Sequence, residues 1–323
     1  METRLILKAT GFIFLLVIGI PANVTVLVAF LLSGIYDTKL LPTDIILTKL
    51  TFVNLVVVLL RGFPQTLIAI RKKVLFDDYG CKLLIFTYRV FRAMSICITS
   101  VLSCYQCIIL LPPSSRWIVL KQKFSHNILP VFLILWCINC IIDIPDGLVY
   151  TCAPINSTIP KYTLNLEFCL VVFPHYFSYV TNGVAYSIRD FSFIGMMAFA
   201  SGYIVTMLYR HNKQVQGIRN SDQKQGNTVE TRAAKAVVLL VTVYIILFGI
   251  DNFIWMYTMT VSNVAPAVSD VRVFVALLYT SVSPMIIIGT NKKIQLRLKC
   301  VFLVSERNIQ ENIRVASNKC MKN

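Results

Sequence analysis

The stretch SVLSCYQCIILLPPSSRW, residues 100–117, closes an apolar run that begins near residue 81. It holds a C-x-x-C, Cys104 to Cys107, followed by Pro112-Pro113, which end a helix because proline lacks a backbone donor. A redox pair works best at the N-terminus of an accessible helix, and zinc would need two further ligands. This pair lies at the C-terminal end of an apolar helix, so we interpret both cysteines as packing residues.

The composition is that of a membrane protein. Of the 323 residues, 56% are hydrophobic and 14% charged, which is too apolar for an ordinary soluble domain. The net charge of +16 could suggest a nucleic-acid partner, but the basic residues lie between apolar runs, so no nucleic acid is expected. A span needs about 20 apolar residues and must be a helix in lipid. Seven segments qualify: 9–32, 44–70, 81–111, 127–150, 186–209, 233–259 and 271–290.

These segments predict an all-α membrane protein, a bundle of seven helices with its N-terminus outside and its C-terminus inside. The odd-numbered loops and the tail carry many more basic residues than the N-terminus and the even-numbered loops. The positive-inside rule therefore places the tail in the cytoplasm. The sequon Asn156-Ser157-Thr158 agrees, because a glycosylated Asn156 must lie in an outer loop.

Three cysteines fall on the predicted outer, oxidising side. Cys81 opens the third span, and Cys152 and Cys169 lie in the loop after the fourth. We expect a disulfide between Cys81 and Cys169, with Cys152 as the alternative partner of Cys81.

The chain divides into a seven-span domain, residues 1–290, and a cytoplasmic tail, residues 291–323. Residues 292–303 alternate basic and apolar side chains directly after the last span, which predicts a short amphipathic helix on the membrane lipids. Cys300 in that setting is a candidate for palmitoylation.

Seven helices with an outer N-terminus and a cysteine at the top of the third span resemble a G-protein-coupled receptor. The rhodopsin-type motifs are altered: Tyr105-Gln106-Cys107 stands in place of Asp-Arg-Tyr, and Ser283-Pro284 in place of Asn-Pro. The altered pattern resembles the vomeronasal type-1 pheromone receptors in the following stretches: LPTDIILTKLTFVNLVVVLLRGFPQTL (41–67), CKLLIFTYRVFRAMSI (81–96), LLPPSSRW (110–117), FSFIGMMAFASGYIVTMLYRHNKQVQ (191–216) and SPMIIIG (283–289). The resemblance implies a chemosensory receptor for small molecules in the plasma membrane that couples to a Gi/o-type G protein.

Charged side chains inside the spans are the candidate ligand-binding residues, because an intramembrane charge is costly. They and nearby aromatic residues can converge on a pocket that opens outward, lined by Arg61, Tyr88, Arg89, Arg92, Arg189, Asp251 and Trp255. The arginines favour a ligand with a carboxylate or sulfate group. The alternative is that the same residues form internal Arg–Asp ion pairs.

The inner face carries the candidate coupling residues. Tyr105, Gln106, Arg116, Lys121 and Lys123 would meet the G protein, although ordinary positive-inside charge or anionic lipid explains the basic ones equally well. The absence of an Asp-Arg-Tyr motif removes an ionic restraint on the inactive state. Pro284 in the seventh span is a candidate hinge.

Other functions are less favoured. No nucleotide motif, metal constellation or cofactor site is predicted, which argues against an enzyme, and the seventh segment has no lysine for a retinal Schiff base. A transporter or channel is the alternative from another class of protein. Its charges should run through the full membrane depth, whereas the charges here cluster in the outer half of the spans. Among receptors, a bitter-taste receptor is the nearest alternative.

Overall fold

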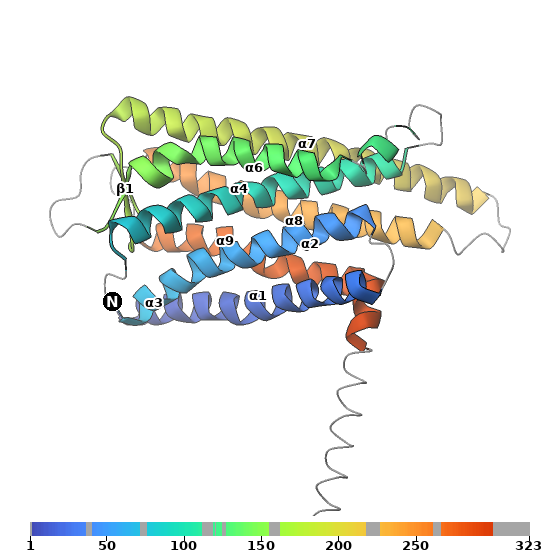
Figure 1. The fold of residues 1–323 in the computed structure, drawn as a ribbon, viewed down its shortest axis with the longest axis horizontal. Coiled ribbons are helices and arrows are strands. Elements are labelled where there is room, and N and C mark those ends of the chain that lie inside the picture. The colour runs from blue at the N-terminus through green and yellow to red at the C-terminus, as the bar shows by residue number, and fades with distance from the viewer. Residues whose placement is uncertain are drawn as a thin grey trace, which may run out of the picture.

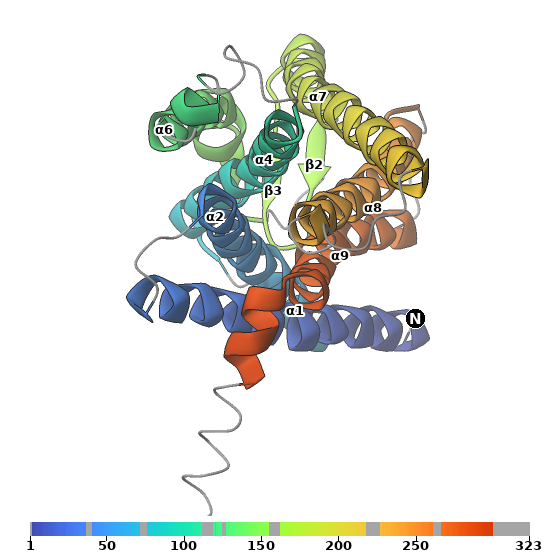
Figure 2. The same cartoon turned by 90° about the vertical axis from the view of Figure 1, so that its right-hand side faces the viewer.

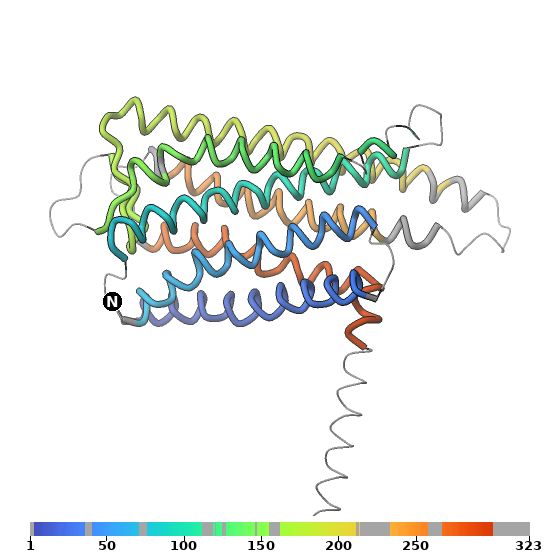
Figure 3. The backbone as a smooth tube through the Cα atoms, in the orientation of Figure 1, coloured from blue at the N-terminus to red at the C-terminus, as the bar shows by residue number. Residues whose placement is uncertain are grey.

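The computed structural model describes residues 2–36, 41–71, 76–111, 119, 121–124, 127–154, 162–217, 227–260 and 266–299 (Figure 3). All seven apolar segments form helices that lie lengthwise in one bundle (Figures 1 and 2). Helices α1 (Glu2–Tyr36) and α2 (Pro42–Val57) make the first span and the inner part of the second. The second span continues through the π-helical turn η1 (Val58–Gly62) into α3 (Phe63–Arg71).

The remaining spans follow in chain order. Helix α4 (Asp78–Ile109) is the third, and α6 (Ile128–Ile144) with the π-helical turn η2 (Pro145–Val149) is the fourth. Helices α7 (Tyr176–Gly217), α8 (Asn227–Thr260) and α9 (Pro266–Thr290) complete the bundle. Among the described residues, six helices have the length and hydropathy to cross a membrane alone, and α6 is a shorter apolar helix that η2 extends.

The helices extend beyond the predicted apolar segments. Helix α7 begins at Tyr176 rather than at residue 186, and α8 begins at Asn227 rather than at residue 233. Hydropathy marks where a chain enters lipid, whereas backbone hydrogen bonds continue through polar turns on either side. Residues 292–299 are helical, within the predicted amphipathic segment; Cys300 lies outside the described residues. In this short helix Ile294 is buried in the main core, while Leu296 is 63% exposed.

Helix α4 is the central element of the bundle. Asp77 caps its outer end by accepting a hydrogen bond from the Gly80 N–H at 2.9 Å. Its inner half buries small polar side chains such as Ser95, Thr99 and Ser103, which let neighbouring helices approach closely. Thr99 and Ser103 satisfy their hydroxyls on carbonyl oxygens four residues earlier. The main core therefore surrounds α4.

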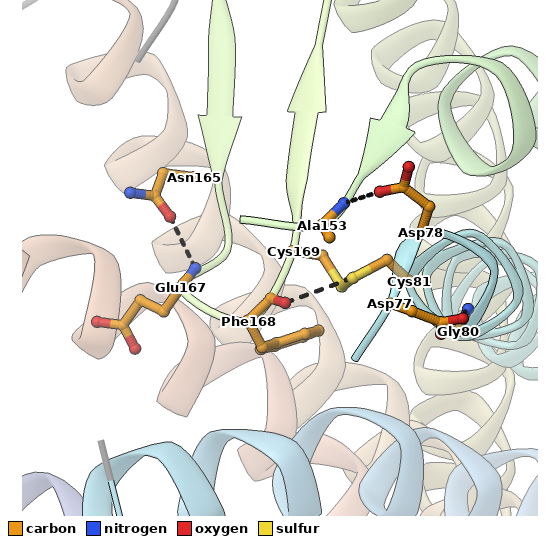
Figure 4. Close-up of a disulfide and its surroundings, with 9 residues drawn as sticks. All are labelled: Asp77, Asp78, Gly80, Cys81, Ala153, Asn165, Glu167, Phe168 and Cys169. Carbon is orange, nitrogen blue, oxygen red and sulfur yellow. Dashed lines mark hydrogen bonds between the residues drawn. A yellow bond between two sulfur atoms is a disulfide. The ribbon is translucent and has the colours of Figure 1, made fainter. Parts of the chain in front are cut away.

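A small antiparallel sheet covers the outer end of the bundle, the end at which the N-terminus also lies (Figure 1). Its strands β1 (Thr151–Cys152), β2 (Thr163–Asn165) and β3 (Leu170–Val172) are ordered β1-β3-β2. Between β2 and β3 the chain passes through Glu167, which has a φ of 70°. A disulfide joins Cys81 at the start of α4 to Cys169 at the start of β3 (Figure 4).

This pairing is the first of the two expected alternatives, and Cys152 is a free thiol. The disulfide is buried in a second cluster with Ile85, Phe168 and Val171. We call residues 162–173 the lid, because they lie across the outer ends of the helices (Figure 1). Asn156 lies outside the described residues.

Candidate functional site

Two π-helical turns shape the outer half of the bundle. Extra residues in a helical turn rotate the side chains that follow, and such turns are frequent at functional sites. In η2, a Cβ on Gly147 would lie 2.6 Å from the Phe86 Cα of α4, so only glycine allows this approach. In η1, a Cβ on Gly62 would lie 2.8 Å from a Leu16 methyl group of α1. The turn η1 also carries Arg61.

Arg61 lies beneath the lid and is 4% exposed. Its guanidinium carbon is 4.9 Å from the centre of the Phe168 ring in the lid and 5.5 Å from that of Tyr88 in α4. Cation–π contacts of this kind attract a buried cation. They do not supply hydrogen-bond acceptors for the N–H groups that point outward in the guanidinium plane. The Arg61 Nη1 has no hydrogen-bond partner among the described residues.

Asp251 of α8 joins two arginines from two other helices. Its Oδ2 is 2.5 Å from Nη2 of Arg92 in α4, and its Oδ1 is 3.1 Å from Nε of Arg272 in α9. The Arg272 guanidinium also stacks on Trp255 at 4.2 Å. The structure thus brings Arg92, Asp251 and Trp255 together and adds Arg272. In the sequence, Arg272 could be recognised only as a basic residue inside the predicted segment 271–290.

A third cluster lies between α6 and α7. Arg189 is 3.3 Å from Asp143 and 2.9 Å from Asp190, and it donates to Asn139 at 3.4 Å. The guanidinium groups of Arg89 and Arg189 both pack on the ring of Tyr186, at 5.1 and 5.0 Å. The predicted arginines therefore divide among three neighbourhoods, around Phe168, Asp251 and Tyr186.

The space between α4, α8 and α9 is small. A cavity of about 30 Å³ lies beside Arg92 and Asp251, with Tyr244, Tyr279 and Thr280 on its other walls. This volume holds roughly one or two water molecules. Around Arg92 and Asp251 the bundle is therefore closely packed.

Salt bridges fasten the lid to the helices around it. Glu167 pairs with Lys8 of α1 and accepts a hydrogen bond from Gln65 of α3 at 2.8 Å. Lys8 also lies 2.7 Å from Asp270 at the start of α9, which accepts from Arg4 at 3.1 Å. Figure 4 shows Glu167 and Phe168 next to the disulfide, and the Asp78 carboxylate accepting from the Ala153 N–H at 2.6 Å. No sequence pattern predicted these pairs, because their members are far apart along the chain.

The middle of the bundle is held by uncharged polar groups. Asn54 of α2 donates to Ser283 of α9 at 2.8 Å and accepts from Ser95 of α4 at 2.6 Å. Asn23 of α1 donates to the Thr280 carbonyl of α9 at 3.0 Å. Pro284 lies inside α9 next to this network. Four helices, α1, α2, α4 and α9, therefore meet beside the candidate hinge.

A larger cavity, of about 240 Å³, opens at the inner end of the bundle. Gln106, 3% exposed, is on its wall, with Leu102, Leu240 and Ile287 as apolar neighbours. Lys293 lies on its rim and pairs with Asp44 at 3.2 Å.

The other predicted coupling residues are placed in part. The Tyr105 ring stacks on Phe124 at 5.6 Å. Lys121 donates to the carbonyls of Ile109 and Leu111 at 2.8 and 3.3 Å, which caps the C-terminal end of α4. Lys123 is exposed, and Arg116 lies outside the described residues.

The fold is that of the seven-helix G-protein-coupled receptors. The structure superposes on squid rhodopsin with a TM-score of 0.74 over 94% of this chain and 87% of that one, at 18% sequence identity. The predicted fold class, an all-α membrane bundle, is confirmed.

The family follows from the sequence comparisons. Residues 8–300 match the model of the vomeronasal organ pheromone receptor family. The chain is 42% identical to the Danio rerio protein named olfactory receptor class A-like protein 1, over 96% of this chain and 98% of that protein. It is 30% identical to vomeronasal type-1 receptor 1 of Gorilla gorilla gorilla over 86% and 78% of the two chains, and 30% identical to vomeronasal type-1 receptor 45 of Mus musculus over 86% of each.

The chain belongs to the vomeronasal type-1 receptor family, which confirms the resemblance drawn from its motifs. It is a chemosensory G-protein-coupled receptor and a multi-pass protein of the plasma membrane, not an enzyme.

Proposed function

We propose that this receptor binds small, pheromone-like molecules in the outer half of its bundle and activates a Gi/o-type G protein at its inner face. The observation that carries the outer site is the gathering of buried charge there. Arg61 and Asp251 are each 4% exposed, and Arg92 and Arg189 approach from two further helices. Charge is retained inside a membrane bundle where function needs it.

The ligand-binding residues in this proposal are those of the sequence prediction together with Arg272. Tyr88 and Trp255 would contact the apolar body of a ligand, because each already lies against an arginine that faces the same region. Arg89 and Arg189 would shape the side of the site next to α7. A ligand enters by displacing parts of the lid, whose contacts with α1 and α3 are charged and exchange with water.

At the inner face, the cavity beside Gln106 supports a coupling site. Its apolar walls and polar rim suit the end of an amphipathic helix from a partner protein. Tyr105 and Lys123 are expected at the edge of that contact, whereas Lys121 would act by holding the end of α4. Pro284 would let the inner part of α9 move when the cavity changes shape.

The test is a reporter assay on the full chain carrying an N-terminal epitope tag. Cells are exposed to a panel of steroids, sulfated steroids and small volatiles, and cyclic AMP is measured after forskolin with and without pertussis toxin. The proposal expects at least one compound to lower cyclic AMP and the toxin to abolish the response.

Gln106→Arg places a charge in the inner cavity and should reduce the response at equal surface expression. Arg210→Gln, an exposed change on α7, is the matched control and should not. A response that persists in toxin would contradict Gi/o coupling. Ion flux without any G-protein signal would instead support the channel alternative.

A further inference from the structure

The arginines of the outer half are not equivalent, and their partners tell them apart. Arg92 and Arg272 share the Asp251 carboxylate, and Arg189 is held by Asp143 and Asp190. None of the ion pairs between described residues involves Arg61, and its Nη1 has no hydrogen-bond partner there. Arg61 nevertheless is the most deeply buried of these four side chains.

A buried guanidinium without an acceptor is an expensive arrangement. Burying an unpaired charge is costly, and cation–π contacts with rings return only part of that cost. A structural arginine would be expected to find a carboxylate, as the neighbouring ones do. An unsatisfied buried donor of this kind commonly marks the place of a group that is not part of the protein.

The local backbone also singles out this position. Arg61 is carried by the π-helical turn η1, which interrupts a regular helix between α2 and α3. The residue after it, Gly62, packs closely against Leu16 of α1, so the turn cannot shift towards that helix without a clash. The Arg61 guanidinium is thereby held between Tyr88 of α4 and Phe168 of the lid.

We infer that Arg61 is the residue that recognises the anionic group of the ligand, a carboxylate or a sulfate, while the Phe168 and Tyr88 rings contact the adjoining apolar body. Arg92 and Arg272 do not take this role, because both are already paired with Asp251. The guanidinium fork donates to two oxygens of such a group at once. This inference rests on the proposed function, since it names the ligand class of the same outer site.

The experiment measures ligand affinity through the thermal unfolding of the purified full chain in detergent. The probes are matched pairs that differ only in charge: steroid sulfates with their parent alcohols, and aromatic or aliphatic carboxylates with their primary amides. Charged members of at least one pair should stabilise the wild-type receptor at about 10- to 100-fold lower concentration than their neutral partners.

Arg61→Gln should remove this preference for the charged member and leave the affinity for the neutral one within about threefold, while Arg61→Lys should retain part of the preference. Arg210→Gln is the matched control on the surface of α7 and should behave as wild type. If Arg61→Gln does not fold, the comparison of Arg61→Lys with wild type decides, because lysine keeps the charge but loses the bidentate geometry.

Three results overturn the inference: no charge preference in wild type, a preference that survives Arg61→Gln, or an equal loss for both members of a pair. The last would make Arg61 structural. An anionic compound that activates Gi/o signalling equally in wild type and Arg61→Gln would refute the inference and leave the proposed function standing. Charge-dependent binding without any G-protein response would refute the function and leave the inference standing.

Discussion

Asp251 of α8 is one carboxylate shared by two arginines from two other helices. Its two carboxylate oxygens face Arg92 of α4 and Arg272 of α9, and its own exposure is only 4%. The three side chains together carry one net positive charge inside the bundle. Because the carboxylate is the shared partner, its loss should be felt more strongly than the loss of either arginine.

Asp251→Asn should therefore destabilise the receptor, since two arginines then face each other without a counter-charge. Both arginines keep about 30% of their side-chain surface exposed, so water screens part of the repulsion. We expect a loss of about 1–3 kcal/mol in the free energy of unfolding, measured by thermal or denaturant unfolding in detergent.

The double variant Asp251→Asn with Arg272→Gln should recover part of that loss, because it removes one of the two uncompensated charges. Unchanged stability in the single variant, or an additive loss in the double, would contradict the shared-partner interpretation.

At the scale of elements, the lid is positioned by a disulfide, by ionic contacts and by the small hydrophobic cluster around Phe168. Its strands β2 and β3 have three residues each, too few to be stable alone. The Cys81–Cys169 bridge closes a sequence separation of 88 residues and ties β3 to α4. The Glu167 contacts with Lys8 and Gln65 add α1 and α3.

Removing the disulfide should impair folding, whereas removing the free thiol should not. Cys81→Ser and Cys169→Ser should each lower surface expression severely, since such bridges contribute about 2–5 kcal/mol in small secreted domains. Cys152→Ser is the matched control and should express as wild type. Equal loss in Cys152→Ser, with normal expression of Cys169→Ser, would assign the bridge to the other cysteine.

The free thiol of Cys152 gives a pH-dependent measurement on intact cells. Burial raises the pKa of the Cys152 thiol, with the nearby Asp78 carboxylate adding to the effect. Only the thiolate reacts with a membrane-impermeant maleimide, so labelling should be slow at neutral pH. The rate should still be rising above a pH of about 8.5, where an ordinary thiol is half ionised. Labelling that levels off below that pH would contradict a half-buried Cys152.

At the scale of the whole molecule, the two ends of the bundle differ in chemistry. The outer end has the lid, the disulfide and paired charges, whereas the inner end has an open cavity lined mainly by apolar side chains. Between them lies the uncharged network around Asn54. Among the described residues, charge therefore does not run through the full depth of the bundle. This distribution favours a receptor over a permeation path, whose charges should extend across the membrane.

The orientation predicted from the basic residues has a direct test. An antibody against an N-terminal epitope should label intact cells, and one against a C-terminal epitope should label only permeabilised cells. Asn156→Gln should remove a glycan and increase electrophoretic mobility, since that loop is predicted to face the lumen during synthesis. Labelling of the C-terminal epitope on intact cells would reverse the assigned topology.

The sequence by itself determined the seven helices, the family and the residues from which an outer site could be built. These follow from local rules: about 20 apolar residues cross a bilayer, and short motifs keep their spacing. It also identified most of the buried charges, because a charge within an apolar segment is visible without knowing its partner. The disulfide was narrowed to two pairings in the same way.

Only the tertiary structure decided which charge meets which. Arg92 and Asp251 are 159 positions apart, as are Lys8 and Glu167, and no local pattern encodes such a distance. The π-helical turn around Arg61 depends on packing against α1, so it too was beyond a periodicity argument. The sequence treated the arginines as one set of ligand-binding cations. In the folded bundle Arg92 and Arg189 are paired with carboxylates, whereas the Nη1 of Arg61 has no partner in the described structure. Pairing depends on where helices meet rather than on what each contains.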